Sequence, residues 1–297
     1  MKNQYVADIG DYGKYALLRA FAREGVKIGV NWYLTEDDGS SDGKFTYYLD
    51  KKDLRWYEPE LFDVLKKINR KKTKSVLDIQ KYGVIPNSCF YNEIIKTNGK
   101  PAERKKYREE WFEKSMYTLS KADLIFSDPD NGLLEKNDAT AISAKKYVLP
   151  LEIERMFNAG HNVVYYCHKG RRKLFQWHDY LSVMFERIDG AKPVVLTFHK
   201  GTQRSYVFMI HEKDFVQYRK IIDSFHSKWY PLFTEEYTNK GDVTRKTAGE
   251  PFMLKRGKSD IVTIQEREDD KFQIYSSDDP STFMIMDADM ICDRLMS

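Results

Sequence analysis

Residues 124–132 have the sequence LIFSDPDNG, and two later segments resemble them: 163–172, VVYYCHKGRR, and 194–204, VVLTFHKGTQR. Each begins with a short run of apolar, β-branched or aromatic residues and stops at polar residues with a glycine. Continuous apolar runs of this length are typical of strands buried on both faces of a parallel sheet. Helical patterns separate the three runs, so we predict a parallel α/β sheet with right-handed crossovers.

Apolar residues at helical or strand spacing predict the remaining elements. Helices are expected over 11–23, 59–68, 102–120, 144–160, 175–188 and 213–229, and further strands over 26–34, 75–79 and 204–211. About six residues join 194–198 to 204–211, so these two strands should form an antiparallel hairpin at the edge of the sheet. We therefore expect a three-layer, Rossmann-like, mostly parallel α/β domain over residues 1–238. Residues 239–297 are acidic and rich in turns, and we expect a small β-rich appendage or tail there.

Composition excludes several classes of protein. The chain has 297 residues and a formal charge of +4, and its three cysteines are scattered without a CxxC pair. This argues against a disulfide framework and against a structural zinc site. The apolar runs are far shorter than the ~20 residues that cross a bilayer, and the first residues lack the apolar core of a signal peptide. A cytoplasmic protein without a membrane partner is expected, and its oligomeric state is left open.

Three basic clusters, 66–74, 100–108 and 169–173, indicate a polyanionic partner. Lysine and arginine displace condensed counterions from nucleic-acid phosphates, so we expect this partner to be DNA, with or without base modifications. For the first two clusters a solvated helix face is an equally good interpretation. The third cluster follows a predicted strand end, so we give more weight to the interpretation that this cluster binds phosphates.

Ligands of open α/β sheets bind beyond the carboxyl ends of the strands. The three similar strand ends should therefore bring together a catalytic group of two carboxylates, an amide and two histidines: Asp128, Asp130, Asn131, His168 and His199. The same loops supply cations that could bind flanking phosphates: Lys169, Arg171, Arg172, Lys200 and Arg204. Any one of these motifs alone is more typical of a turn or of a structural histidine, so the interpretation depends on their repetition in successive strands.

A second acidic loop, 35–43 (TEDDGSSDG), follows the strand over 26–34 and contains Asp37, Asp38 and Asp42. Together with Asp128 and Asp130 these side chains could bind Mg²⁺ for phosphodiester hydrolysis. Neither acidic loop has the glutamate that an EF-hand requires at its twelfth position, and we expect no metal. The block 8–15, DIGDYGKY, is interpreted as a helix N-terminus with Asp11 in the capping position.

Across residues 11–230 the order of elements resembles a Rossmann-like nucleic-acid methyltransferase, whose sheet also ends in a hairpin. In that family an Asp-Pro-Pro-Tyr or Asn-Pro-Pro-Tyr motif holds the target amine and the base, and Asp128-Pro129 stands at the matching strand end. The resemblance implies an S-adenosylmethionine site at the end of the first strand. There, however, the chain has Thr35-Glu36-Asp37-Asp38-Gly39 in place of a Gly-x-Gly loop, so we expect no cofactor.

Asp128-Pro129 and the run His199-Lys200-Gly201-Thr202 also resemble two motifs of the uracil-DNA glycosylase superfamily, although the Pro-Ser-Pro run of that family is missing. In that family the acid orients water and the histidine stabilises the departing base. We therefore expect a DNA glycosylase-like hydrolase, with a role in defence against foreign or modified DNA such as that of phages. The alternatives are a methyltransferase, a Mg²⁺-dependent nuclease and a binding protein without catalytic activity.

Overall fold

Seven of the described strands form one sheet in the order β2-β1-β3-β6-β8-β7-β9. The computed structural model describes residues 1–39, 45–136 and 138–236, together with the backbone of four later strands between residues 252 and 287. The strands of the sheet are β1 (Ile28–Asn31), β2 (Ser88–Tyr91), β3 (Leu124–Ser127), β6 (Asn162–His168), β7 (Ala191–Phe198), β8 (Arg204–His211) and β9 (Phe233–Glu236). Because β2, β1, β3 and β6 are all parallel, the predicted α/β class with a mostly parallel central sheet is confirmed.

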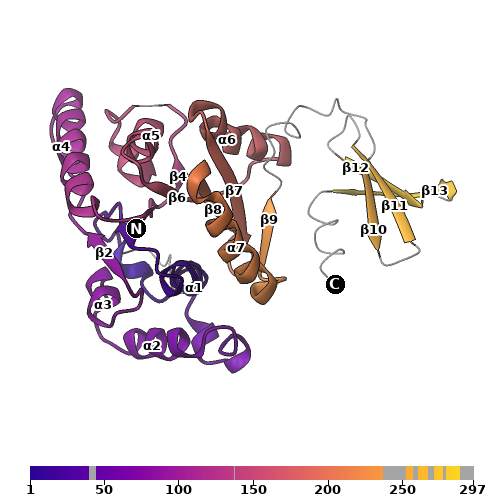
Figure 1. Cartoon of the computed structure of the whole chain (residues 1–297), viewed down its shortest axis with the longest axis horizontal. Helices are drawn as coiled ribbons and strands as arrows, with labels where there is room; N and C mark the ends of the chain where they lie inside the picture. The colour runs from indigo at the N-terminus through magenta and orange to yellow at the C-terminus, as the bar shows by residue number, and fades with distance from the viewer. Residues whose placement is uncertain are drawn as a thin grey trace. The chain divides into compact units, whose positions relative to one another are not determined.

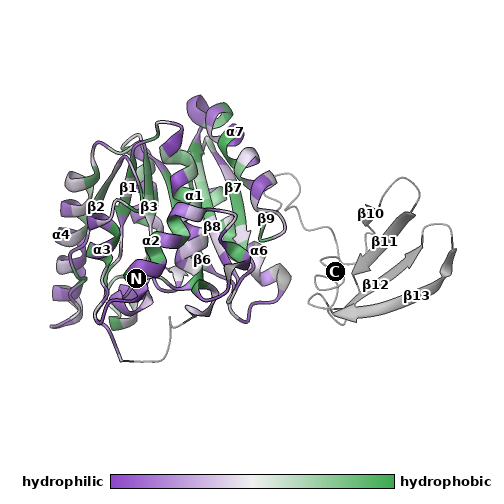
Figure 2. Ribbon diagram, turned by 90° about the horizontal axis from the view of Figure 1, so that it is seen from below, coloured by the Kyte–Doolittle hydropathy of each residue, from purple (hydrophilic) through white to green (hydrophobic). Residues whose placement is uncertain are grey.

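Helices cover both faces of this sheet and complete the three layers (Figure 1). One face carries α1 (Ile9–Arg23), α2 (Pro59–Asn69) and α7 (Glu212–Trp229), and the other carries α4 (Pro101–Leu119), α5 (Pro150–Asn158) and α6 (Leu174–Arg187). In β3, Leu124 and Phe126 pack into the core under α1, and Ile125 between them is equally buried. The strand is thus buried on both faces, as its continuous apolar run predicts. Figure 2 shows the same segregation, with apolar colouring concentrated on the strands and on the inner sides of the helices.

The two strands of the predicted hairpin are antiparallel, as expected. The prediction that this hairpin lies at the edge of the sheet is wrong. β8 pairs antiparallel with both β6 and β7, and β9 extends the sheet beyond β7. β8 is an interior strand, and six of its eight residues, 205–210, are buried.

Three local predictions also needed correction. Residues 75–79 were expected as a strand but belong to α3 (Val76–Lys81), which begins at a capping box in which Ser75 N donates to Asp78 Oδ2 at 3.0 Å. The expected helix over 144–160 starts only at Pro150, because the residue before a proline is disfavoured in the helical conformation. Leu149 accordingly has an extended backbone with ψ 145°. Finally, α1 is capped by Asp8 rather than Asp11, since Asp8 Oδ1 accepts from Asp11 N at 2.9 Å.

The described residues also form two smaller sheets. β4 (Gly132–Leu133) and β5 (Tyr147–Val148) form a short parallel pair. The later part of the chain forms a separate antiparallel sheet of β10 (Phe252–Arg256), β11 (Asp260–Glu266), β12 (Lys271–Ser276) and β13 (Asp279–Asp287), in sequence order. Among the described helices, none combines the length and the apolar character needed to cross a membrane.

Candidate functional site

A cavity of about 250 Å³ lies at the carboxyl ends of β3 and β6. The first turns of α1 form one wall, the loop 128–131 after β3 forms a second, and the start of β8 forms a third. These segments are far apart in the sequence and meet because α1 packs over the end of the sheet. A cavity of this size has room for a group as large as a nucleobase.

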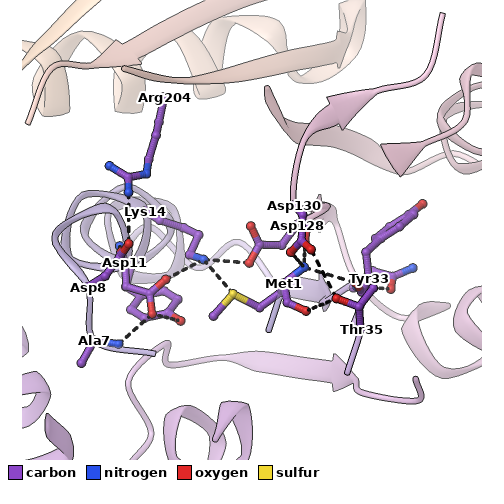
Figure 3. Close-up of polar contacts among 12 residues, drawn as sticks. Met1, Ala7, Asp8, Asp11, Lys14, Tyr33, Thr35, Asp128, Asp130 and Arg204 are labelled. Atoms are coloured by element: carbon purple, nitrogen blue, oxygen red, sulfur yellow. Dashed lines mark hydrogen bonds and ion pairs between the residues drawn. The ribbon is translucent and has the colours of Figure 1, made fainter. Parts of the chain in front are cut away.

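Asp128 is the central carboxylate of this cavity (Figure 3). Its side chain is buried, and Oδ2 accepts a hydrogen bond from Lys14 Nζ at 2.7 Å. Burial raises the pKa of Asp128 above its usual range, and the Lys14 ammonium only partly opposes this shift. A buried acid with a raised pKa is a common feature of general acid–base sites.

Lys14 joins two carboxylates, because its Nζ also lies 2.7 Å from Asp11 Oδ1. Burial alone would lower the pKa of Lys14, but Asp11 and Asp128 together raise it, so the ammonium remains protonated. Asp11 is itself held by hydrogen bonds from Ala7 N and Tyr15 Oη, both at 3.0 Å. The position of Asp128 is therefore fixed by a chain of contacts that begins in α1.

A second ion pair, between Asp8 and Arg204, spans the cavity from α1 to β8 (Figure 3). Arg204 Nη2 lies 3.0 Å from Asp8 Oδ2, and both side chains are largely buried. The guanidinium also lies against Gly10, where an added Cβ would be only 2.3 Å from Arg204 Nε. A glycine at position 10 is therefore required for this close approach. Burial raises the pKa of Asp8 to about 6, despite the opposing charge of Arg204.

This shift predicts a pH dependence of stability that can be assigned to Asp8. Between the ordinary carboxyl pKa of 3.8 and about 6 the folded state binds more protons than the unfolded state. The contribution of Asp8 to the free energy of unfolding therefore falls as pH rises through this range. Asp8→Asn resembles the protonated form and keeps an oxygen for the helix cap, so we expect this variant to gain stability relative to the wild type from pH 4 to pH 7. Urea unfolding across this range measures the difference; a relative loss would mean that pairing with Arg204 outweighs burial.

The acidic loop after β1 binds the first residues of the chain. Asp38 Oδ2 pairs with Lys2 Nζ at 2.5 Å, and Asp37 Oδ1 accepts from Gln4 N at 3.1 Å. Asp37 and Asp38 thus have partners away from Asp128, and Asp42 lies outside the described residues. Within the described part of the chain, no three His, Cys, Asp or Glu side chains are arranged to hold a metal ion.

Met1 lies between the ends of β1 and β3. Its amino nitrogen is 2.8 Å from Asp130 Oδ1 and donates to the carbonyl oxygens of Asp128 and Tyr33. Its carbonyl oxygen accepts from Thr35 N at 3.0 Å. Asp130 is therefore paired with the N-terminal segment, whereas the Oδ1 atom of Asp128 has no hydrogen bond among the described residues.

The structure brings together some of the predicted site residues and separates others. Asp128, Asp130, Asn131, His168 and Arg204 all line the cavity. His168 Nδ1 lies 3.2 Å from Gln203 O, and burial lowers the pKa of its imidazole. His168 is therefore neutral near pH 7.

His199 does not line the cavity. Its Nε2 lies 2.7 Å from Oγ1 of Thr234, near the start of β9. The reason is the position of β8, which separates β7 from β6, so that the end of β7 lies two strand spacings, about 10 Å, from that of β6 instead of one. The prediction placed the two strand ends side by side because the sequence pattern does not show that β8 inserts between them.

Four of the five predicted phosphate-binding residues lie on the two loops after β6 and β7, and the fifth, Arg204, is the first residue of β8. Lys169, Arg171 and Lys200 form no ion pair with another described side chain. Arg172 instead stacks on the ring of Tyr180 at 4.0 Å and lies 3.7 Å from Glu135. Three of the predicted cations are thus available to an anion and two, Arg172 and Arg204, have partners in the protein.

Sequence reasoning missed the contribution of α1. Asp8, Asp11 and Lys14 all line the cavity, although the block 8–15 was interpreted as a helix N-terminus alone. Their spacing of three residues places them on one helical face, and this was a signal that the sequence contained. Tyr206 of β8 was also missed, since an aromatic residue within an apolar strand usually indicates core.

No protein-family model matches the sequence, and no curated protein matches it significantly. Among solved structures, the fold is similar to that of protein LPL1258 from Legionella pneumophila str. Philadelphia 1, which is described as a DUF519 protein. The match has a TM-score of 0.43 and 15% sequence identity, and covers 79% of this chain and 98% of the other. A likeness at this level carries no argument about function.

Proposed function

We propose that the chain is an enzyme that hydrolyses the bond between a base and its sugar in DNA, with the base held in the cavity beside Asp128. The observation that carries this proposal is a buried carboxylate with a free oxygen, fixed by Lys14, in a cavity of about 250 Å³. Enzymes that act on a base in duplex DNA must extrude it into such a pocket. The proposal includes a role in defence against foreign DNA, such as that of phages.

The proposed step uses Asp128 as the group that orients and deprotonates water. The bond between C1′ and the base nitrogen breaks, and its electron pair leaves with the base. The water oxygen bonds to C1′, and its proton passes to the free Oδ1 of Asp128. The carboxylate also stabilises the positive charge that develops on the sugar. Lys14 holds the other oxygen at 2.7 Å and so keeps Oδ1 directed toward the cavity.

The free cations near the cavity support DNA as the substrate. Lys169 and Arg171 follow His168, which lines the cavity at the end of β6, and Lys200 lies two residues before Thr202, which also lines it. Phosphate contacts fix the position of a nucleic acid without reading its sequence. They would place the extruded nucleotide at the mouth of the cavity.

Replacing these three residues together with glutamine is expected to weaken DNA binding about tenfold or more, because each lost phosphate contact reduces the slope of log Kd against log salt by about one. The matched control is a triple variant of the other two basic clusters, Arg70→Gln, Lys72→Gln and Lys105→Gln. Fluorescence anisotropy over a range of salt concentrations measures both variants. If the control reduces the slope and the first variant does not, DNA binds through the helices and not at the strand ends.

One observation favours methyl transfer as a second candidate. β8 runs antiparallel between β6 and β7, so the sheet contains an antiparallel hairpin, as in the methyltransferases that the sequence resembles. The end of β1, however, does not fit S-adenosylmethionine. It carries the bulky, buried side chains of Trp32 and Tyr33 in place of glycines, and Thr35 N donates to Met1 O.

One experiment separates the candidates. The protein is incubated with single-stranded and duplex DNA, unmodified and carrying modified bases, in EDTA with and without S-adenosylmethionine, and with Mg²⁺. Free base and abasic sites formed in EDTA support the proposal. Strand cleavage only with Mg²⁺ favours a nuclease, and a cofactor-dependent mass gain of one methyl group favours methyl transfer. Binding without any product leaves a binding protein.

A further inference from the structure

Tyr206 has a hydroxyl group that lacks a partner and lies in the wall of the cavity. Its side chain is 1% exposed, and Oη forms no hydrogen bond with any described residue. A buried hydroxyl without a partner lowers the stability of the fold, and such groups are rare in folded proteins. A hydroxyl left free in a cavity wall therefore indicates a hydrogen bond that is completed by a ligand.

The ring of Tyr206 cannot easily turn to find another partner. It packs against Phe126, Tyr166 and Phe233, with ring centroids 6.0–6.3 Å apart. These contacts come from three different strands or their ends, so they hold the ring on several sides. The direction of the hydroxyl is set by the sheet itself.

Burial raises the pKa of Tyr206, so its hydroxyl keeps its proton at neutral pH. A protonated phenol can donate one hydrogen bond, and no described residue accepts it. The cations of Lys14 and Arg204 and the carboxylate of Asp128 all act on this hydroxyl, which therefore lies among the charged groups of the cavity.

We propose that Tyr206 donates a hydrogen bond to a ring nitrogen or carbonyl oxygen of the base in the cavity, and that it stabilises the negative charge on that base as it leaves. This inference rests on the proposed function. Of the two histidines expected to take this role, His199 lies outside the cavity, and His168 lines it with Nδ1 3.2 Å from Gln203 O. When the bond to C1′ breaks, the electron pair stays on the base. Tyr206 keeps its proton, and solvent protonates the base after release.

The test compares Tyr206→Phe with Tyr165→Phe. Tyr165 is a matched control because it lies in the neighbouring strand β6, is equally buried and also has an unpaired hydroxyl, but does not line the cavity. Binding is measured by fluorescence anisotropy with a short labelled single strand of DNA whose central base is varied among the four bases. We expect Tyr206→Phe to raise the Kd about tenfold for at least one base, and Tyr165→Phe to leave it unchanged.

Thermal unfolding without DNA provides a second readout. Removing a hydroxyl that has no partner should leave the Tm of Tyr206→Phe equal to or above that of the wild type. A clear fall in Tm together with unchanged DNA binding would show that the hydroxyl is bonded within the protein, and would overturn the inference.

The two proposals fail in different ways. If the wild type releases a base, and Tyr206→Phe binds and releases it at the wild-type rate, the inference is overturned and the proposed function stands. If Tyr206→Phe loses binding but the wild type releases no base, the contact with the base is supported and the proposed reaction is overturned.

Discussion

Replacing Asp128 with asparagine is expected to slow base release by about three orders of magnitude, a loss in the range of removing a general acid or base. The amide has nearly the same size and shape, so the cavity keeps its volume. Asparagine cannot take a proton from water and carries no charge to stabilise the sugar cation. Because binding depends on other residues, we expect the Kd for DNA to change little.

The measurement is the rate of base release in a single turnover, with enzyme in excess over DNA. Asp37→Asn is the matched control, because Asp37 is an acidic residue of the other loop and binds Gln4 rather than the cavity. It should retain the wild-type rate. Full activity of the Asp128 variant would place the reaction elsewhere in the protein.

Arg108→Met is expected to lower the free energy of unfolding by about 3–5 kcal/mol, because it leaves a buried charge without its partner. Arg108 in α4 pairs with Glu152 in α5 through two hydrogen bonds, at 2.6 and 2.9 Å, and both side chains are buried. Glu152 also accepts from Tyr33 Oη at 3.0 Å. The pair thus holds two helices and the end of β1 together.

Chemical denaturation measures this effect, and two variants make it specific. Arg155→Met removes a more exposed cation, which pairs with Glu109 and Glu113, and should cost less than about 1 kcal/mol. Arg108→Met combined with Glu152→Leu removes both buried charges and should recover part of the loss. A double variant less stable than Arg108→Met would mean that the hydrogen bonds of Glu152 matter more than its charge.

The elements that determine the α/β class could be predicted from local sequence. The apolar runs at 124–127 and 163–167 belong to neighbouring parallel strands, because burial on both faces imposes the same pattern wherever such strands lie. The position of β8 could not be predicted, since strand order depends on pairing between distant segments. The same insertion displaced His199 from the site. β2 was missed because the short run Ser88–Tyr91 begins with two small residues and lacks a strand pattern.

The candidate site could be predicted only in part, for a related reason. Asp128 and Asp130 come just after β3 in the sequence, so the strand pattern predicts where they lie. The contribution of α1 depends on how that helix packs over the sheet. The ion pairs of Lys14 and Asp8 connect α1 to residues more than 100 positions away. No local pattern contains that information.

The pair of Asp8 and Arg204 has a consequence for how the protein matures. The two residues are 196 positions apart, so one wall of the cavity comes from the first turn of the first helix and another from a strand near residue 204. During synthesis the early helix leaves the ribosome long before β8 exists. Closing so large a loop comes late in folding, after local structure has formed. A nascent chain that has not reached β8 therefore contains Asp128 and Lys14 but no complete cavity, and the cavity forms only after most of the central sheet has been made.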